Sequence, residues 1–288
     1  MTTPVETPLF FEHAGRRLYG VHYPARDPAS SRSGLILCQA PGHEADLSLR
    51  VLVDFARLAA QAGIDVLRFD YTGCGESQGD FEDATVEGWL EDVAAGMRFL
   101  RDRTGVDAVG LLGLRLGGTL AALAAQRQPA VNWVCLWEPI MTPTRYVDEL
   151  LQMQLISHNL WASTPLQSRQ QLFKRQDGTV ELMGYCWRRE TLEALQQLEV
   201  LSVVGGLAVP CLAVGISPAG NTSKTLKPLE EVLRQKGDPC AFVQVSEAVF
   251  WQTTSRPFLD VHTWHRQDRL FSETLRWMTA NALLASHA

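Results

Sequence analysis

The sequence lacks several features that would each assign it to a special class of protein. Its six cysteines lie singly, with no Cys-x-x-Cys pair, which argues against a disulfide scaffold or a zinc site and favours reduced thiols. The formal net charge is -6, whereas a nucleic-acid binder would show a basic face. No apolar run is long enough to span a bilayer, and residues 1–10 carry no signal-peptide pattern. We therefore expect a cytoplasmic protein without nucleic-acid partners or stable membrane insertion.

The composition that remains is that of an ordinary globular domain. Of the 288 residues, 46% are hydrophobic and 20% are charged, which is too apolar for a disordered chain. A chain of this length can bury a large core in one domain. We find no internal repeat, low-complexity tract or Pro/Ser-rich linker, so we predict a single domain over residues 1–288.

Short apolar runs, which predict strands, alternate along the chain with amphipathic stretches, which predict helices. The predicted strands cover 33–38, 64–69, 106–112, 131–137, 208–216 and 241–245. The predicted helices cover 50–61, 85–100, the small-residue stretch to 126, the region of 226–233, and 269–284. This alternation predicts an α/β fold with a mostly parallel sheet covered by helices on both faces.

The alternation of strands and helices stops in segment 141–200, whose pattern contains a dense apolar stretch and predicts helical or irregular structure. We expect an inserted helical lid over the carboxyl ends of the strands. The alternative is a pair of helices that only completes the core, and the pattern favours neither.

The strongest local motif is Leu111-Leu-Gly-Leu-Arg-Leu-Gly-Gly118, where a predicted strand runs into a helix. This is the layout of a nucleophile elbow, in which Gly113 and Gly117 permit a tight turn. The central residue projects above the sheet, and the following amide, that of Leu116, points into an anion hole. Here the central residue is Arg115, whose protonated guanidinium cannot attack a carbonyl carbon.

Two further loops follow predicted strands. The loop Ala40-Pro-Gly-His-Glu-Ala45 places His43 and Glu44 where a second anion donor would lie, or else forms a surface turn. The glycine-rich loop 70–79 is similar to the Gly-x-Gly-x-x-Gly fingerprint of dinucleotide-binding proteins. Its third glycine, Gly79, however, lies one position too far along the chain. We therefore interpret that loop as a structural turn and expect no cofactor.

Together, Phe69-Asp-Tyr-Thr-Gly-Cys-Gly-Glu-Ser, the arginine elbow and the strand–helix order resemble the α/β-hydrolase superfamily over essentially the whole chain. Gly113-Leu-Arg-Leu-Gly117, Leu136-Trp-Glu-Pro-Ile140 and Phe250-Trp-Gln-Thr253 further resemble the exosortase A system-associated hydrolase 2 family. That resemblance implies a role beside exopolysaccharide synthesis and protein sorting, with arginine as the usual elbow residue.

The resemblance also locates the three positions of a catalytic triad. The nucleophile position holds Arg115, and the acid position, after the strand near 215–216, offers only Ser217, Pro218 and Ala219. The histidine position, after the last strand, offers Val249 or a neighbour. All three positions therefore depart from the superfamily pattern, and the standard Ser-His-Asp triad is absent.

Displaced catalysis is the alternative to a lost triad, with His43 and His262 as reserve residues. His262 and His265 stand at i, i+3 without a nearby HExxH glutamate, so we expect no metal site. Free thiols such as Cys38 and Cys74 are candidate nucleophiles, but burial in the core is the commoner role of cysteine.

Arg115 has two interpretations of equal weight. Its guanidinium can bind a carboxylate, phosphate or sugar-phosphate at the floor of the cleft. It can also close the pocket by pairing with Glu44 or Glu138. Trp251 is expected either to line the same cavity or to pack in the core.

Three functional hypotheses follow. The first is a hydrolase-like protein without the standard triad, which binds a small acyl, ester or anionic ligand through Arg115, Leu116, His43, Glu44, Glu138 and Trp251. The second is an active ester or thioester hydrolase with displaced catalytic residues. The third is a non-enzymatic interaction module with a filled pocket. The sequence names no protein partner.

Overall fold

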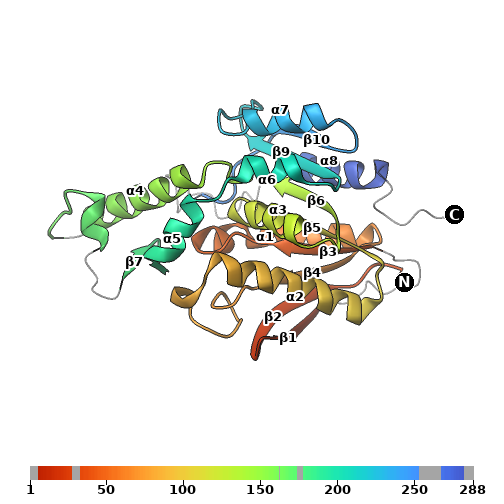
Figure 1. Ribbon diagram of the computed structural model, residues 1–288, viewed down its shortest axis with the longest axis horizontal. Coiled ribbons are helices and arrows are strands. Elements are labelled where there is room, and N and C mark those ends of the chain that lie inside the picture. The colour runs from red at the N-terminus through yellow and green to blue at the C-terminus, as the bar shows by residue number, and fades with distance from the viewer. Residues whose placement is uncertain (1–5, 28–32, 162, 174–177, 253–266, 282–288) are drawn as a thin grey trace.

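The structure is a computed structural model, and it describes residues 6–27, 33–161, 163–173, 178–252 and 267–281. Its centre is an eight-stranded sheet in the order β1-β2-β4-β3-β5-β6-β9-β10, which runs through the middle of the molecule (Figure 1). The six strands from β4 to β10 pair in parallel, and β2 joins them antiparallel through β4. The predicted mostly parallel sheet is therefore confirmed.

All six predicted strands are present. The parallel strands are β3 (Ser33–Cys38), β4 (Asp65–Phe69), β5 (Ala108–Leu114), β6 (Val131–Trp137), β9 (Cys211–Ser217) and β10 (Ala241–Ser246). The four central ones are almost wholly buried because helices cover both of their faces. Strands buried on both faces have continuous apolar runs, which is why the sequence predicted these four strands.

The sequence interpretation missed the antiparallel hairpin at one edge of the sheet. It consists of β1 (Thr7–His13) and β2 (Arg16–Tyr23), paired from Thr7 with His22 to His13 with Arg16. β1 is an edge strand that is largely exposed or half-buried, so it needs no continuous apolar run. Its polar content hides it from a search for buried strands.

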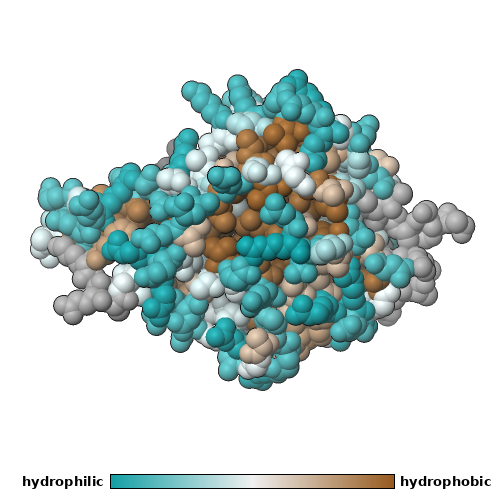
Figure 2. Space-filling view, in the orientation of Figure 1, coloured by the Kyte–Doolittle hydropathy of each residue, from teal (hydrophilic) through white to brown (hydrophobic). Residues whose placement is uncertain are grey.

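Helices cover both faces of the sheet. α1 (His43–Gln61) and α8 (Asp268–Ala280) contribute to the core on one face. α2 (Val86–Thr104), α3 (Leu116–Arg127), α6 (Val200–Gly206) and α7 (Lys227–Lys236) contribute to the core on the other. Figure 2 shows hydrophobic residues gathered near the centre of the viewed face, where α3 and α6 lie in Figure 1, with hydrophilic residues around them. None of the helices in the described ranges is long and apolar enough to cross a membrane.

The predicted start of the first helix is wrong, and the difference matters for the site. The sequence predicts a helix from residue 50, but α1 begins at His43, directly after Gly42 in a left-handed conformation (φ 84°). Glu44 and Asp46 lie in the first turn, where the helix dipole stabilises negative charge. The first two turns of α1 contain several polar residues, so the spacing of apolar residues did not predict them.

Segment 141–200 emerges between β6 and α6 and extends to one side of the sheet (Figure 1). It contains α4 (Pro143–Trp161), a 3₁₀ turn (η2, Arg169–Phe173), the antiparallel pair β7 (Thr179–Leu182) and β8 (Tyr185–Arg188), and α5 (Arg189–Gln196). The small two-stranded sheet was not expected. The function of this segment as a lid stays a prediction.

Candidate functional site

Arg115 stands at a tight turn between β5 and α3. Its backbone has φ 54° and ψ -122°, a sparsely populated conformation for a residue with a side chain. The turn is held by hydrogen bonds from the Arg115 amide to the Trp137 carbonyl (2.9 Å) and from the Gly118 amide to the Arg115 carbonyl (3.0 Å). These bonds give the turn a defined shape, as the elbow motif predicts.

The elbow glycines are required by close backbone approach. A Cβ atom at Gly113 would lie 2.2 Å from the Gly117 carbonyl oxygen. A Cβ atom at Gly117 would lie 2.1 Å from the carbonyl oxygen of Cys38, at the end of β3. Both contacts are far below van der Waals distance, so the turn tolerates only glycine at these two positions.

The guanidinium of Arg115 pairs with Glu44. Arg115 Nε donates to Glu44 Oε1 at 3.1 Å, and the two side chains are 13% and 3% exposed. The hydroxyl of Tyr146, from α4, donates to Glu44 Oε2 at 3.4 Å. The Arg115 Cζ atom also lies over two aromatic rings, 5.9 Å from the centroid of Tyr146 and 5.3 Å from that of Trp251.

Glu138 occupies a separate place at the end of β6. It also has a positive φ (42°), and its Oε2 accepts a hydrogen bond from the Ile216 amide at 2.7 Å. Burial raises the pKa of the Glu138 carboxyl, while that hydrogen bond and the charge of Arg115 oppose the shift. Of the two carboxylates that the sequence offered as salt-bridge partners for Arg115, the structure pairs it with Glu44.

A small open pocket of about 80 Å³ adjoins the elbow. Of the six residues predicted to bind a ligand, Arg115 and Glu138 line this pocket, whereas the other four do not: Leu116, His43, Glu44 and Trp251. Ligand binding by these residues stays a prediction. The remaining lining residues come from the end of β6, from α4 and from the loop before α7: Pro139, Ile140, Met141, Thr142, Arg145, Tyr146, Glu149 and Thr225.

His43 begins α1, beside the Glu44–Arg115 pair. Burial lowers the pKa of the His43 imidazole, against the opposing charge of Glu44. A neutral imidazole is therefore favoured at neutral pH. His262, the other reserve residue, lies outside the described residues, as does His265.

The positions of a triad acid and histidine hold side chains with other roles. Ser217 ends β9, and its hydroxyl donates to the Asn221 carbonyl at 3.1 Å within the following turn. Glu247 follows β10, where its carboxylate accepts the amides of Arg269 (2.6 Å) and Leu270 (3.2 Å) at the start of α8. Glu247 therefore stabilises a helix terminus, which satisfies amides that the helix leaves open.

The candidate cysteine nucleophiles are thiols held in apolar surroundings. Burial raises the pKa of Cys38 to about 12 and that of Cys74 to about 12. At neutral pH both are protonated, and only a thiolate attacks efficiently. Within the described residues no cluster of three or more His, Cys, Asp or Glu side chains could hold a metal ion.

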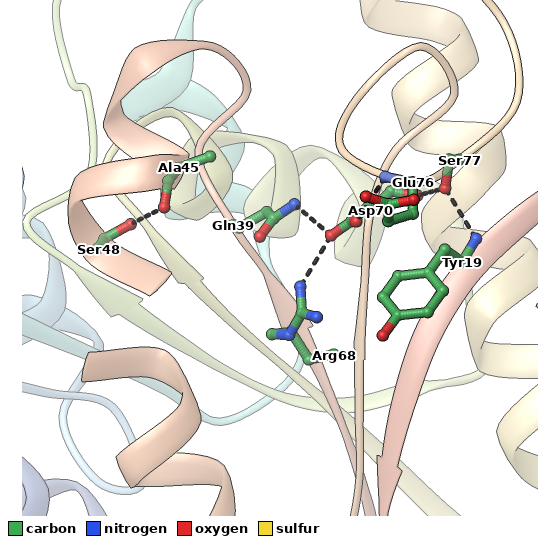
Figure 3. A network of polar contacts seen from close by, with 8 residues as sticks. All are labelled: Tyr19, Gln39, Ala45, Ser48, Arg68, Asp70, Glu76 and Ser77. Carbon is green, nitrogen blue, oxygen red and sulfur yellow. Dashed lines mark hydrogen bonds and ion pairs between the residues drawn. The ribbon is translucent and has the colours of Figure 1, made fainter. Parts of the chain in front are cut away.

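The loop after β4 is held by a buried polar network, shown in Figure 3. Asp70 Oδ1 accepts from Arg68 Nη1 at 2.8 Å and from Gln39 Nε2 at 3.1 Å, and Oδ2 accepts the Glu76 amide at 3.1 Å. The Ser77 hydroxyl donates to the Asp70 carbonyl at 2.5 Å. Ser77 and Asp70 therefore fix the shape of this turn, while its interpretation as purely structural stays a prediction.

The sequence interpretation missed Tyr146 as a site residue. It stood in a dense apolar stretch of the predicted lid, and the structure places its hydroxyl on Glu44 and its ring beside Arg115. No local signal marks this tyrosine, because its partners lie on α1 and at the elbow. Only the tertiary fold, in which α4 begins shortly after the end of β6 and beside the elbow, brings them together.

Comparison with known sequences identifies relatives of part of the chain. The family described as serine aminopeptidase, S33 (Hydrolase_4) matches residues 45–183, just under half of the chain. The uncharacterized protein RP471 of Rickettsia prowazekii is 24% identical over 140 residues, which cover 48% of this chain and 58% of that protein. This chain thus matches less than two thirds of the length of its curated relative.

Solved structures match almost the whole chain. Est1E from Butyrivibrio proteoclasticus, determined with ferulic acid bound, has a TM-score of 0.67 at 17% identity, covering 95% of this chain and 98% of Est1E. The Pyrococcus furiosus esterase Pf2001 gives 0.62 at 15% identity, covering 96% and 91%. The α/β hydrolase GrgF from Penicillium sp. sh18 gives 0.62 at 17% identity, covering 96% and 99%. At such identities the likeness concerns the fold.

Proposed function

This chain has the α/β-hydrolase fold, and from that premise we propose that it binds a ligand bearing an acyl, ester or anionic group without cleaving it through a Ser-His-acid triad. The observation that carries the proposal is Arg115 on the elbow between β5 and α3. A guanidinium cannot act as a nucleophile, but it donates strong hydrogen bonds to carbonyl and carboxylate oxygens.

The surroundings of the elbow support binding over catalysis. Ser217 and Glu247 are engaged in a turn and at a helix terminus, and Cys38 and Cys74 are buried thiols. The pocket beside Arg115 favours a small ligand over a filled interaction module. The bound ferulic acid in the Est1E structure supports the idea that this architecture accommodates an organic acid.

We place this binding function beside exopolysaccharide production and exosortase-dependent protein sorting. The support is the resemblance of three short motifs, around Arg115, Glu138 and Trp251, to the exosortase A system-associated hydrolase 2 family. The alternative is an active ester or thioester hydrolase that uses displaced residues such as His43 or His262.

The test is an ester and thioester panel, with p-nitrophenyl acetate, p-nitrophenyl butyrate and acyl-CoA substrates. We expect negligible turnover by the wild-type protein. We also expect no gain for Arg115→Ser, because the histidine and acid positions would still lack catalytic side chains. Circular dichroism would verify that both proteins are folded.

Saturable wild-type turnover that falls in His43→Ala would overturn the proposal and favour displaced catalysis. The His43 variant is the control for contaminating esterases, since a contaminant would not respond to a substitution in this chain.

A further inference from the structure

The guanidinium of Arg115 is fixed on one edge and open on the other. Its Nε atom is bonded to Glu44, and the rings of Tyr146 and Trp251 lie within 6 Å of its Cζ atom. Within the described residues, no side chain or carbonyl hydrogen-bonds its two terminal nitrogen atoms, Nη1 and Nη2. The group is therefore oriented before any ligand arrives, which lowers the entropic cost of binding.

The pocket at this site has the dimensions and lining of a small-molecule subsite. Its volume of about 80 Å³ is enough to hold several water-sized groups. Pro139, Ile140 and Met141 give it apolar walls, while Glu138 contributes a carboxyl group and Arg145 and Glu149 contribute an ion pair (2.7 Å).

Resting on the proposed function, we propose that this pocket takes a short monocarboxylate, with the ligand carboxylate on the terminal nitrogens of Arg115. The paired N–H donors of a guanidinium match the two oxygens of a carboxylate. The apolar walls accommodate a short carbon chain. The Glu138 carboxyl disfavours a second negative charge, since the other lining cation, Arg145, is already paired with Glu149. The free acid and the carboxyl end of a longer, unbranched molecule share this chemistry.

Glu44 is the positioning residue for this recognition. It is 3% exposed and holds the Nε side of the guanidinium, so it directs the terminal nitrogens without occupying them. Its negative charge opposes an anionic ligand, but its hydrogen bond sets the geometry that a two-point contact requires. A glutamine at this position keeps an acceptor oxygen for Nε and removes the charge.

The experiment is an NMR titration of ¹⁵N-labelled protein at constant ionic strength, with sodium chloride as the ionic control. The probes are acetate, propionate, hexanoate, the branched pivalate, the dianion malonate and neutral acetamide. We expect saturable shifts with acetate, propionate and hexanoate, and at least about tenfold weaker binding of pivalate, malonate and acetamide.

The variants separate recognition from charge. Arg115→Gln should weaken acetate binding by about 10- to 100-fold, and Arg115→Lys by about tenfold, since one ammonium cannot present a fork. Arg127→Gln, on the same helix but paired with Glu87, is the matched control and should bind as the wild type does. Glu44→Gln keeps an acceptor for Nε and removes the opposing charge, so it should bind acetate more tightly than the wild type, while Glu44→Ala removes the acceptor and should lose binding.

Undiminished acetate binding in Arg115→Gln, or tighter binding in Glu44→Ala, would overturn the proposal. Neutral esters that bind through Arg115 while no carboxylate does would also overturn it, yet would leave the proposed function standing. Ester turnover in the preceding assay would remove the proposed function itself, so the two failures are distinguishable.

Discussion

Two features of Arg115 destabilise the folded state: its backbone conformation and the burial of its charge. Its backbone has a positive φ, and its charge is largely removed from water. The charge is compensated by Glu44, which is itself almost completely buried and lies in the first turn of α1. Each member of this buried ion pair therefore depends on the other, because either one alone would leave an uncompensated charge.

A double-mutant cycle tests this dependence. Arg115→Leu should destabilise the fold by about 3 kcal/mol, since it leaves Glu44 buried without a counter-charge. Arg115→Leu combined with Glu44→Gln should recover at least about half of that loss. Urea unfolding followed by tryptophan fluorescence measures the free energy of unfolding of the wild type, the two single variants and the double variant. Purely additive effects of the two substitutions would refute the coupling.

The elbow depends on contacts between several elements. The turn between β5 and α3 lies against the ends of β3 and β6. The β5–α3 turn packs against the carbonyls at the end of β3, and the Arg115 amide is bonded to Trp137 at the end of β6. The glycines at 113 and 117 let the backbone segments approach each other. The same closeness places the first turn of α1, with Glu44, within reach of the arginine.

Gly117→Ala tests this packing. The added Cβ would lie 2.1 Å from the Cys38 carbonyl oxygen, so the backbone must shift and stability should fall by at least about 2 kcal/mol. Gly205→Ala, in α6, is the matched control, because its Cβ would find its nearest atom at 3.8 Å. That variant should be neutral or more stable by about 0.5–1 kcal/mol. Equal melting temperatures for both variants would contradict the assignment.

At the scale of the whole molecule, several buried carboxyl groups make stability depend on pH. Asp92, on α2, is 1% exposed and accepts hydrogen bonds from the Thr72 amide (2.8 Å) and hydroxyl (3.0 Å). Burial raises the pKa of Asp92, and the hydrogen bonds from Thr72 oppose the shift. The folded protein therefore binds this proton more tightly than the unfolded chain does.

The sign of the effect follows by linkage. The contribution of Asp92 is fully present below its unfolded pKa, about 4, and is lost as pH rises through its raised folded value. Asp92→Asn cannot ionise, so it does not lose stability in this way. The stability of the variant relative to the wild type should therefore increase as pH rises from the unfolded pKa of Asp92 to its raised folded pKa. Parallel urea-denaturation curves of wild type and Asp92→Asn at every pH would contradict the prediction.

The sequence by itself determined the six parallel strands, because each is a buried apolar run, and the elbow, because Gly113 and Gly117 stand at the spacing that a tight turn requires. It did not reveal the edge strand β1, whose residues are largely exposed, or the early start of α1, whose first turns are polar. It also left Glu44 and Glu138 as equal partners for Arg115.

Only the tertiary structure decided between those two carboxylates and added Tyr146. Glu44 and Arg115 are 71 positions apart, and Glu44 and Tyr146 are 102 apart. Contacts at such separations depend on the order of the strands in the sheet, on the packing of α1 against it and on where α4 begins after β6. Local periodicity and spacing carry no record of that packing, since they report only which faces of each segment are buried.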